Sequence, residues 1–432
     1  MPQPRHAVVL LVAALAGCGT PPPHTASTPL PGVTTTLTDG ARRIAAHRVA
    51  AVDSRRIGHT AWWEAVAPSL TSPALTTTPI GRSLLGRELR AVTFGHGATR
   101  VLLWSQMHGD ESTATMALAD LFAWLADPAP DALRDRLARE LTITMVPMLN
   151  PDGAERFQRE NAAGIDINRD ARRLATPEAR ALKTLRDSLK PSFGFNLHDQ
   201  GARTRAGLHG PQAAIALLAP AIDATGRYDA VRNTARRVAA SIAAALADSI
   251  PGRVAKYDEG FNPRAFGDLM QTWGTSTVLI ESGALPNDPD KQRLRLMNGA
   301  ALLVALDVIA STRAAVGASA AYDDLPPNSG GAVDLLVRGG MLVLPGQAPF
   351  RADLALNYDD LLLKTNLRLR EVGDLSAVIA IDTIDATGLF IHPDTSSLRT
   401  GSDGSWLPLG GITSLRLAET ADPRNPSRIT VP

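Results

Sequence analysis

The sequence contains a single cysteine, Cys18, among its 432 residues. One thiol cannot build an intrachain disulfide framework or a cysteine-rich zinc site, so any bound zinc must be held by histidine and carboxylate side chains. The sequence also has little net charge, with a formal value of +1. The chain as a whole therefore has no strong electrostatic attraction for nucleic acid or for an anionic surface, and we expect no nucleic-acid partner.

The apolar run near the N-terminus, Ala7–Ala16, is too short to span a bilayer but has the length of a signal-peptide core. It leads into Leu15-Ala16-Gly17-Cys18, which resembles the bacterial lipobox. The resemblance implies a lipoprotein signal peptide at residues 1–17, lipidation of Cys18, and export to the periplasmic side of a membrane or the cell surface. The membrane would then be a partner through the lipid anchor. A plain secretory signal with an incidental cysteine is the alternative.

The composition, 44% apolar and 20% charged, is typical of a globular protein, and the length allows more than one domain. Residues 18–41 are rich in proline and threonine and predict an extended tether. Across 42–320, buried strands alternate with helical patterns, which predicts an α/β domain with a mixed, mostly parallel sheet covered by helices on both faces. A linker at 326–331 precedes short alternating strands, which predict a small β-sandwich-like domain at 332–432. We expect a structural or docking role for that domain.

Hydrophobic periodicity predicts the elements of the first domain. The predicted strands are Arg100–His108, Leu141–Leu149, Ser192–His198 and Thr277–Glu281, and Ile80–Phe94 indicates a turn that enters a strand. The predicted helices are 42–66, Ser112–Leu125, Pro177–Leu189, Tyr228–Ile250 and Asp290–Thr312.

Three of the predicted strands end at possible zinc-site residues. His108 ends one strand and Glu111 follows it by three residues, while His198 and Glu281 end two others. Ligands of open α/β sheets bind outside the carboxyl ends of the strands, so we expect these side chains to converge. Two imidazoles and one carboxylate leave a fourth zinc position for water, and a further carboxylate can act as general base. The pattern predicts a zinc hydrolase.

The order of motifs between about Ile80 and Thr312 supports this prediction. A G-x-S-x-x-G-R turn at Gly81–Arg87 precedes the H-x-x-E pair, and the turn Asn150–Gly153 and the pair Asn168-Arg169 follow it. A strand-end histidine and a final strand-end glutamate complete the set. In this order the motifs resemble those of the zinc metallocarboxypeptidases, the carboxypeptidase A-like family. The resemblance implies one Zn²⁺ per chain, held by His108, Glu111 and His198, with Glu281 as the general base.

The resemblance also implies residues that recognise the substrate. Asn168 and Arg169 would bind its terminal carboxylate, a task that suits the planar fork of arginine. Arg159 would polarise the scissile carbonyl and stabilise the oxyanion, with Arg156 as a rival for that role. Tyr257 would be the mobile tyrosine that closes over the substrate, with a packed core tyrosine as the alternative.

The sequence departs from the family pattern after Asn168-Arg169, where Asp170 follows, and after His198, where Asp199-Gln200 follows, and Gly267 bears on specificity. Gly267, in a segment that resembles the family's specificity pocket, falls where the digestive enzymes carry the residue at the pocket base. With no acid there, we expect no preference for basic side chains. Asp170, directly after Asn168-Arg169, places a negative charge near the expected carboxylate site.

The function predicted is hydrolysis of C-terminal peptide bonds by a zinc- and Glu281-activated water, with a peptide or peptidoglycan peptide as substrate. His108-Gly109-Asp110-Glu111 looks closer to cell-wall peptide amidases and acylamino-acid deacylases, so a peptidoglycan-peptide amidase or an N-acyl amino acid deacylase on the same scaffold is the alternative. A non-enzymatic binding lipoprotein is a further hypothesis, against which the intact ligands and Glu281 argue.

Overall fold

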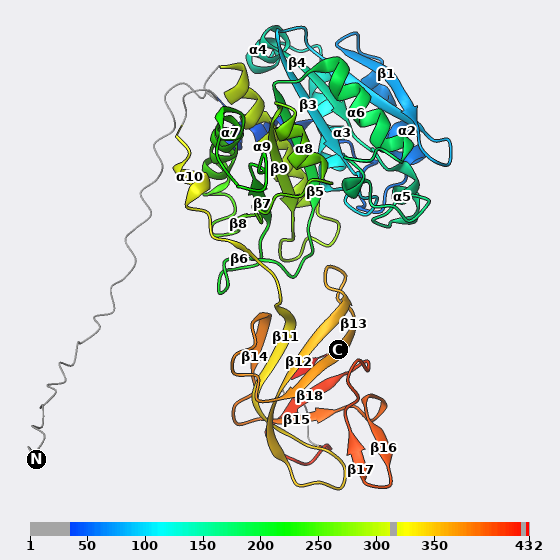
Figure 1. Cartoon of the computed structure of the whole chain (residues 1–432). Helices are drawn as coiled ribbons and strands as arrows, with labels where there is room; N and C mark the ends of the chain where they lie inside the picture. The colour runs from blue at the N-terminus through cyan, green and yellow to red at the C-terminus, as the bar shows by residue number, and fades with distance from the viewer. Residues whose placement is uncertain (1–34, 312–317, 425–428, 432) are drawn as a thin grey trace, which may run out of the picture.

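The computed structural model describes residues 35–311, 318–424 and 429–431. The expected signal peptide and Cys18 lie outside these residues. An α/β domain comes first in the chain and a strand-rich unit follows it (Figure 1). Within the described ranges, no helix is both long enough and apolar enough to cross a membrane.

A mixed sheet of eight strands forms the centre of the first domain, in the order β1-β2-β4-β3-β5-β9-β7-β8. Its strands are β1 (Leu75–Arg82), β2 (Glu88–Phe94), β3 (Thr99–Ser105), β4 (Leu141–Val146), β5 (Phe193–Asp199), β7 (Ile215–Leu218), β8 (Val254–Lys256) and β9 (Ser276–Ser282). The four central strands β4, β3, β5 and β9 run parallel to their neighbours within this group. The predicted α/β class with a mostly parallel sheet is confirmed.

Helices cover both faces of this sheet because its strands are apolar on both sides. Val101 and Leu103 of β3 belong to one hydrophobic cluster, whereas Leu102 and Trp104 belong to another. This alternation follows from the two-residue period of a strand. The helices that contribute to the first cluster are α1 (Leu37–Ala46), α2 (His59–Leu70), α3 (Thr113–Ala126), α4 (Ala132–Glu140), α5 (Pro151–Arg156), α7 (Ala230–Leu246), α9 (Gln292–Ala310) and α10 (Ala320–Asp323). Those that contribute to the second are α6 (Pro177–Leu189) and α8 (Phe266–Thr272).

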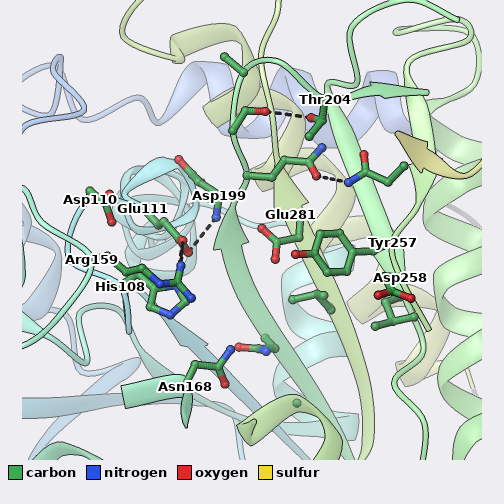
Figure 2. Close-up of a pocket in the computed structure, with 18 of the residues that line it drawn as sticks. His108, Asp110, Glu111, Arg159, Asn168, Asp199, Thr204, Tyr257, Asp258 and Glu281 are labelled. Atoms are coloured by element: carbon green, nitrogen blue, oxygen red, sulfur yellow. Dashed lines mark hydrogen bonds and ion pairs between the residues drawn. The ribbon is translucent and has the colours of Figure 1, made fainter. Parts of the chain in front are cut away.

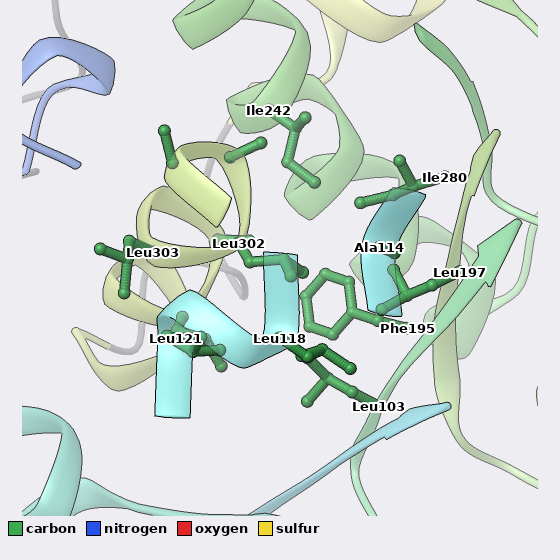
Figure 3. Close-up of a cluster of buried hydrophobic side chains, with 14 of the residues drawn as sticks. Leu103, Ala114, Leu118, Leu121, Phe195, Leu197, Ile242, Ile280, Leu302 and Leu303 are labelled. Atoms are coloured by element: carbon green, nitrogen blue, oxygen red, sulfur yellow. The ribbon is translucent and has the colours of Figure 1, made fainter. Parts of the chain in front are cut away.

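The larger cluster anchors the strands that lead to the site. Figure 3 shows Phe195 of β5 at its centre, beside Leu118 of α3 and Leu302 of α9. All three side chains are buried, and each contributes roughly 1.5–3 kcal/mol through burial of apolar surface. Helix α3 is buried along nearly its whole length, so the segment that follows Glu111 is held rigidly in the core.

Several element boundaries differ from the sequence predictions. Helix α6 has the predicted bounds, because Thr176 caps it by accepting a hydrogen bond from the amide of Ala179. Helix α1 begins at Leu37, inside the expected tether, with Thr36 as its N-cap. The predicted helix at 42–66 is two helices, α1 and α2, and Ile80–Phe94 spans the end of β1 and all of β2, which pair antiparallel.

Strand β3 ends at Ser105, three residues earlier than predicted. Gln106 has a positive φ of 49°, which interrupts the extended backbone, and its carbonyl accepts a hydrogen bond from the amide of Asn150. His108 therefore lies on a tight loop after the strand rather than on the strand itself. Strand β4 likewise ends at Val146 rather than Leu149.

The second unit is built on a seven-stranded sheet with a hydrophobic core of its own. Its strands are β11 (Val333–Leu342), β12 (Phe350–Asp360), β13 (Thr365–Gly373), β14 (Ala380–Asp385), β15 (Phe390–Pro393), β18 (Leu415–Ala418) and β19 (Ile429–Val431). A strand-rich C-terminal region is therefore present, as predicted. The expected linker is partly a strand, since β10 (Asn328–Ser329) pairs with β6 (Arg205–Ala206) of the first domain.

Candidate active site

Three side chains converge beyond the carboxyl ends of β3 and β5. Nδ1 of His108 lies 2.8 Å from Oε1 of Glu111, and Nδ1 of His198 lies 2.6 Å from Oε2 of the same carboxylate. The two Nδ1 atoms are 3.2 Å apart. All three residues are buried, and in the described part of the chain they form a group of donors that could hold a metal ion. Figure 2 shows two of them, His108 and Glu111, side by side.

The orientation of His108 suits a metal role. Its Nε2 lies 3.0 Å from a carboxylate oxygen of Asp166, a contact that orients the ring with Nδ1 toward Glu111. The donor set of two imidazoles and one carboxylate suits zinc.

The electrostatics of the three groups are complementary. Burial lowers the pKa of His198 below the usual imidazole value, which favours the neutral form that binds metals. Burial raises the pKa of Glu111, but the imidazoles of His198 and His108 lower it by more, so its net pKa is well below that of an ordinary carboxyl. Glu111 is therefore ionised over the whole physiological range of pH.

Two of the sequence motifs hold the loop of His108 in place. Asn150 caps the short helix α5 (Pro151–Arg156) by accepting from the amide of Gly153, and its Nδ2 donates to the carbonyl of Arg159 at 3.2 Å. Gly109 packs against Gly153 so closely that a Cβ at Gly109 would lie 2.0 Å from the carbonyl carbon of Gly153. Only glycine fits this position, next to a residue of the metal-ligand group.

The upstream turn motif contacts the N-P-D-G turn directly. Buried Asp152 accepts hydrogen bonds from Oγ of Ser83 at 2.8 Å, from the amide of Leu85 at 2.9 Å and from Nη1 of Arg87 at 2.7 Å. The G-x-S-x-x-G-R turn therefore supports the segment that bears Arg159, and has no contact with the metal-ligand group itself.

Arg159 reaches the metal-ligand group, whereas Arg156 is exposed and does not line the cavity. Nη1 of Arg159 lies 3.2 Å from Oε1 of Glu111, and its Nη2 and Nε donate to Oδ2 of Asp166 at 2.9 and 3.2 Å. The side chain is 39% exposed toward the cavity. Of the two arginines weighed in the sequence, the structure places Arg159 at the site.

Glu281 lies beside the metal-ligand group on β9, where it is paired in register with His198 of β5. Burial, together with the carboxylates of Glu111 and Asp199, raises its pKa well above the usual carboxyl value. Lys291 donates to Asp199 at 2.9 Å and to the carbonyl of Ser282 at 3.2 Å. Its ammonium group therefore places a positive charge beside the carboxylate of Asp199. A carboxyl with a raised pKa in a cavity suits a group that takes up and releases a proton.

The expected carboxylate-binding pair lies in the same cavity. Asn168 accepts from the amide of Phe266 at 2.9 Å, and Arg169 is exposed and donates to the carbonyl of Asn168 at 2.8 Å. Asp170 does not add its charge to this pair, in contrast to the sequence expectation. It is buried and accepts from the amides of Ala175 and Thr176 at 2.9 and 2.7 Å.

Tyr257 also lines the cavity, and Figure 2 shows its hydroxyl end directed toward Glu281. The negative charge of Glu281 and burial raise the pKa of Tyr257 to about 12, so the phenol is neutral and can donate a hydrogen bond. Its ring packs against a small cluster of buried alanines, which combines the two roles considered for it in the sequence.

The cavity has a volume of about 830 Å³ and contains an acid that the sequence argument overlooked. Gly267 lines it as expected, but so does Asp268, the next residue of helix α8. Burial raises the pKa of Asp268 to about 6. Position 267 carries no acid, as the sequence shows, but its neighbour on α8 does, so the residue at 267 alone does not decide the preference of the pocket for basic side chains.

Asp166 and Lys291 were missed as site residues for different reasons. Asp166 stands two residues before Asn168, so its closeness to the Asn168-Arg169 pair was a local signal for it. Lys291 has a left-handed backbone, with φ of 52°, just before helix α9. No local signal in the sequence connects it with Asp199, which lies 92 residues earlier.

Comparison with known proteins agrees with this arrangement. The segment 59–204 matches the zinc carboxypeptidase family and contains His108, Glu111 and His198 but ends before Glu281. Probable carboxypeptidase 2 of Arthroderma benhamiae is 32% identical over 100 residues, 23% of this chain and 19% of that protein. Carboxypeptidase SOL1 of Arabidopsis thaliana is 33% identical over 103 residues, 21% of this chain and 21% of that protein.

Solved structures resemble more than half of this chain at low identity. A metallo-carboxypeptidase from Burkholderia cenocepacia is similar over 59% of this chain and 69% of that one, with 21% identity and a TM-score of 0.47. A Pseudomonas aeruginosa metallo-carboxypeptidase in complex with (2-guanidinoethylmercapto)succinic acid covers 57% and 67%, with 18% identity and a TM-score of 0.42. The chain spans only about a fifth of the length of the curated relatives it matches. The match to the zinc carboxypeptidase family lies over the segment that contains the metal-ligand group.

Proposed function

We propose that this protein is a zinc-dependent metallocarboxypeptidase that hydrolyses the C-terminal bond of peptides. One observation carries the proposal: the convergence of His108, Glu111 and His198, with the buried carboxyl of Glu281 paired in register with His198 and lining the same cavity as His108 and Glu111. The match of residues 59–204 to the zinc carboxypeptidase family supports it.

The chemistry divides between the metal and the side chains. His108, Glu111 and His198 would hold zinc, which supplies Lewis-acid polarisation and lowers the pKa of a water molecule. Glu281 accepts a proton from the attacking water at a carboxylate oxygen and transfers it to the nitrogen of the leaving amine. The raised pKa of Glu281 suits both steps, because the group must hold the proton between them.

Charged and polar groups around the cavity complete the mechanism. The guanidinium of Arg159 provides positive charge for the carbonyl oxygen of the scissile bond, where negative charge develops. Asn168 and Arg169 bind the terminal carboxylate of the substrate, and Arg169 donates to no acidic side chain among the described residues, so its donors are available for that group. Tyr257 donates a hydrogen bond from its neutral phenol to the bound peptide.

The decisive experiment compares free and blocked C-termini. The soluble form that starts after Cys18, loaded with zinc, should release the last residue of N-acylated dipeptides and leave the matching C-terminal amides almost intact. Glu281→Gln should keep the zinc and lose about 10²–10⁴-fold in kcat, since an amide cannot take the proton. Glu64→Gln, an exposed change outside the cavity, is the control.

The same assay separates the alternatives. Equal cleavage of free and blocked peptides would rule out the proposal that the protein is an exopeptidase. In that case peptidoglycan peptides and N-acyl amino acids should be tested as substrates, since an amidase or deacylase could use the same ligands and base. Zinc binding without hydrolysis of any of these compounds would favour a binding protein.

We further propose that the protein is exported and lipid-anchored through Cys18. The support is the apolar run Ala7–Ala16 followed by Leu15-Ala16-Gly17-Cys18. Expression in a bacterium fed with labelled palmitate should label the parent chain in the membrane fraction and leave Cys18→Ala unlabelled. Label retained in the variant would refute the anchor.

A further inference from the structure

The cavity is lined by both parts of the chain. Besides the residues of the first domain, its wall includes Asp359, Asp360, Leu361 and Leu362 of the second unit. They lie where the antiparallel strands β12 and β13 meet, since Asp360 pairs with Thr365 in the last register position of that hairpin. We call residues 359–364 the hairpin tip.

Asp360 both shapes the hairpin tip and attaches it to the first domain. Its Oδ1 accepts from the amides of Leu362 and Leu363 at 2.9 and 3.1 Å, which fixes the turn. Its Oδ2 forms an ion pair with Arg55. The carbonyl of Arg55 in turn accepts from Oγ of Ser112 at 2.6 Å, and Ser112 directly follows Glu111 in the chain.

A second attachment lies next to the strand of His198. Arg203, in the loop after β5, donates to both carboxylate oxygens of Asp334 at 2.7 and 2.8 Å and to the carbonyl of Tyr358 at 2.7 Å. The Asp334 side chain is fully buried, and it also accepts from the amide of Tyr358 at 2.7 Å. Two polar contacts therefore fix the second unit to segments that flank two of the predicted zinc ligands.

Both acids of the hairpin tip that line the cavity are paired with arginines, and the other two lining residues are leucines. Asp360 pairs with Arg55, and Asp359 accepts from Arg368 at 2.6 and 3.0 Å. Leu361 and Leu362 are half-buried and line the cavity, whereas Leu363 is 49% exposed and does not line it. A substrate that reaches this wall meets two leucine side chains.

The position of the wall indicates which part of a substrate it contacts. Figure 2 shows Asn168 and Thr204 on opposite sides of the catalytic groups, with Glu281 between them. Asn168 belongs to the pair that would bind the terminal carboxylate, and Thr204 adjoins Arg203, which holds the second unit. Because Arg203 also donates to the carbonyl of Tyr358, just before the hairpin tip, this arrangement favours contact between the tip and the residues before the scissile bond.

We propose that the hairpin tip is part of the substrate site, where Leu361 and Leu362 select peptides with apolar side chains on the N-terminal side of the scissile bond. This inference rests on the proposed function. It assigns to the C-terminal unit a role in specificity, beyond the structural or docking role expected from its sequence.

The test uses peptides that share their last two residues and differ before them. One carries a leucine and the other a glycine at the position preceding those residues, and the kcat/KM ratio of the two measures the preference. The double variant Leu361→Ser/Leu362→Ser should reduce this ratio about tenfold, the scale of a lost contact in an apolar pocket. Leu363→Ser, from the same turn but outside the cavity wall, should leave the ratio unchanged.

A binding measurement separates this inference from the proposed function. The same peptides are titrated by calorimetry into zinc-loaded Glu281→Gln with and without the two leucine changes. If the parent hydrolyses no peptide but the leucine preference in binding depends on the hairpin tip, the proposed function fails and the inference stands. If hydrolysis occurs and the double variant alters neither the kcat/KM ratio nor the binding preference, the inference is overturned. An equal loss with both peptides would also overturn it, since the hairpin tip would then act only as a structural support.

Discussion

His198 and Glu281 occupy paired positions in the parallel register of β5 and β9. Paired residues on adjacent parallel strands project from the same face, about 4.8 Å apart in the direction of the backbone hydrogen bonds. The register therefore places the proposed general base next to a predicted zinc ligand. A slip of one residue would turn either side chain to the opposite face of the sheet and separate the two groups.

Removal of His198 should abolish metal binding. We expect about one zinc per chain in the parent protein, as measured by atomic emission after dialysis, and a loss of most of the metal in His198→Ala, because two remaining ligands hold zinc poorly. The exposed His96 is a suitable control, and His96→Ala should keep the parent zinc content. Full occupancy in His198→Ala would refute the assignment of the site.

Asp166 should control zinc affinity without contacting the metal. Its carboxylate contacts Nε2 of His108, which orients the ring, and holds Arg159, so Asp166→Ala should weaken zinc binding by about 10–100-fold in competition with a chelator. Asp166→Asn can still accept through its amide oxygen and should lose less. If both variants bind zinc as tightly as the parent, the contact with His108 has no effect on the ligand.

Arg169 should determine affinity for a free carboxylate. Arg169→Ala loses a charged hydrogen bond worth about 1.5–3 kcal/mol, which predicts an increase in KM of about ten- to a hundredfold for substrates with a free C-terminus. Blocked amides should change little. The exposed Arg156 provides a matched control, since Arg156→Ala removes an arginine outside the cavity. A KM that rises equally in both variants would argue against a specific carboxylate site.

Asp268 should make the preference for basic residues dependent on pH. Burial raises its pKa to about 6, above the usual carboxyl value, so the group is neutral below that pH and negatively charged above it. Binding of a C-terminal lysine requires the charged form and should strengthen as the pH rises. The kcat/KM ratio of lysine- to leucine-terminated peptides should increase by up to about tenfold between about pH 5 and about pH 7.

Asp268→Asn should make that ratio independent of pH over the same interval. A comparison with leucine-terminated peptides at each pH removes the contribution of Glu281, whose titration affects both substrates alike. If the ratio in the parent protein does not change with pH, the carboxyl of Asp268 does not contact the side chain of the substrate.

Local pattern was sufficient for the class of fold and for the group of candidate ligands. The strands that lead to His198 and Glu281 are apolar runs bounded by polar residues. Such runs can be recognised in the sequence without knowing which segments pack against them in the fold. Helix α6 has the predicted bounds because Thr176 and Pro177 mark its start with local chemistry. The order of the motifs then indicated one family, whose model matches residues 59–204.

Contacts between segments far apart in the sequence determined the side-chain positions that the local sequence pattern could not predict. Asp170 turns into its own loop, Asp268 lines the cavity, and Lys291 reaches Asp199 across 92 residues of sequence. The attachment of the hairpin tip through Arg55 and Asp360 spans 305 residues. Side-chain direction and domain packing depend on which surfaces meet in the folded chain, and neither periodicity nor motif spacing carries that information.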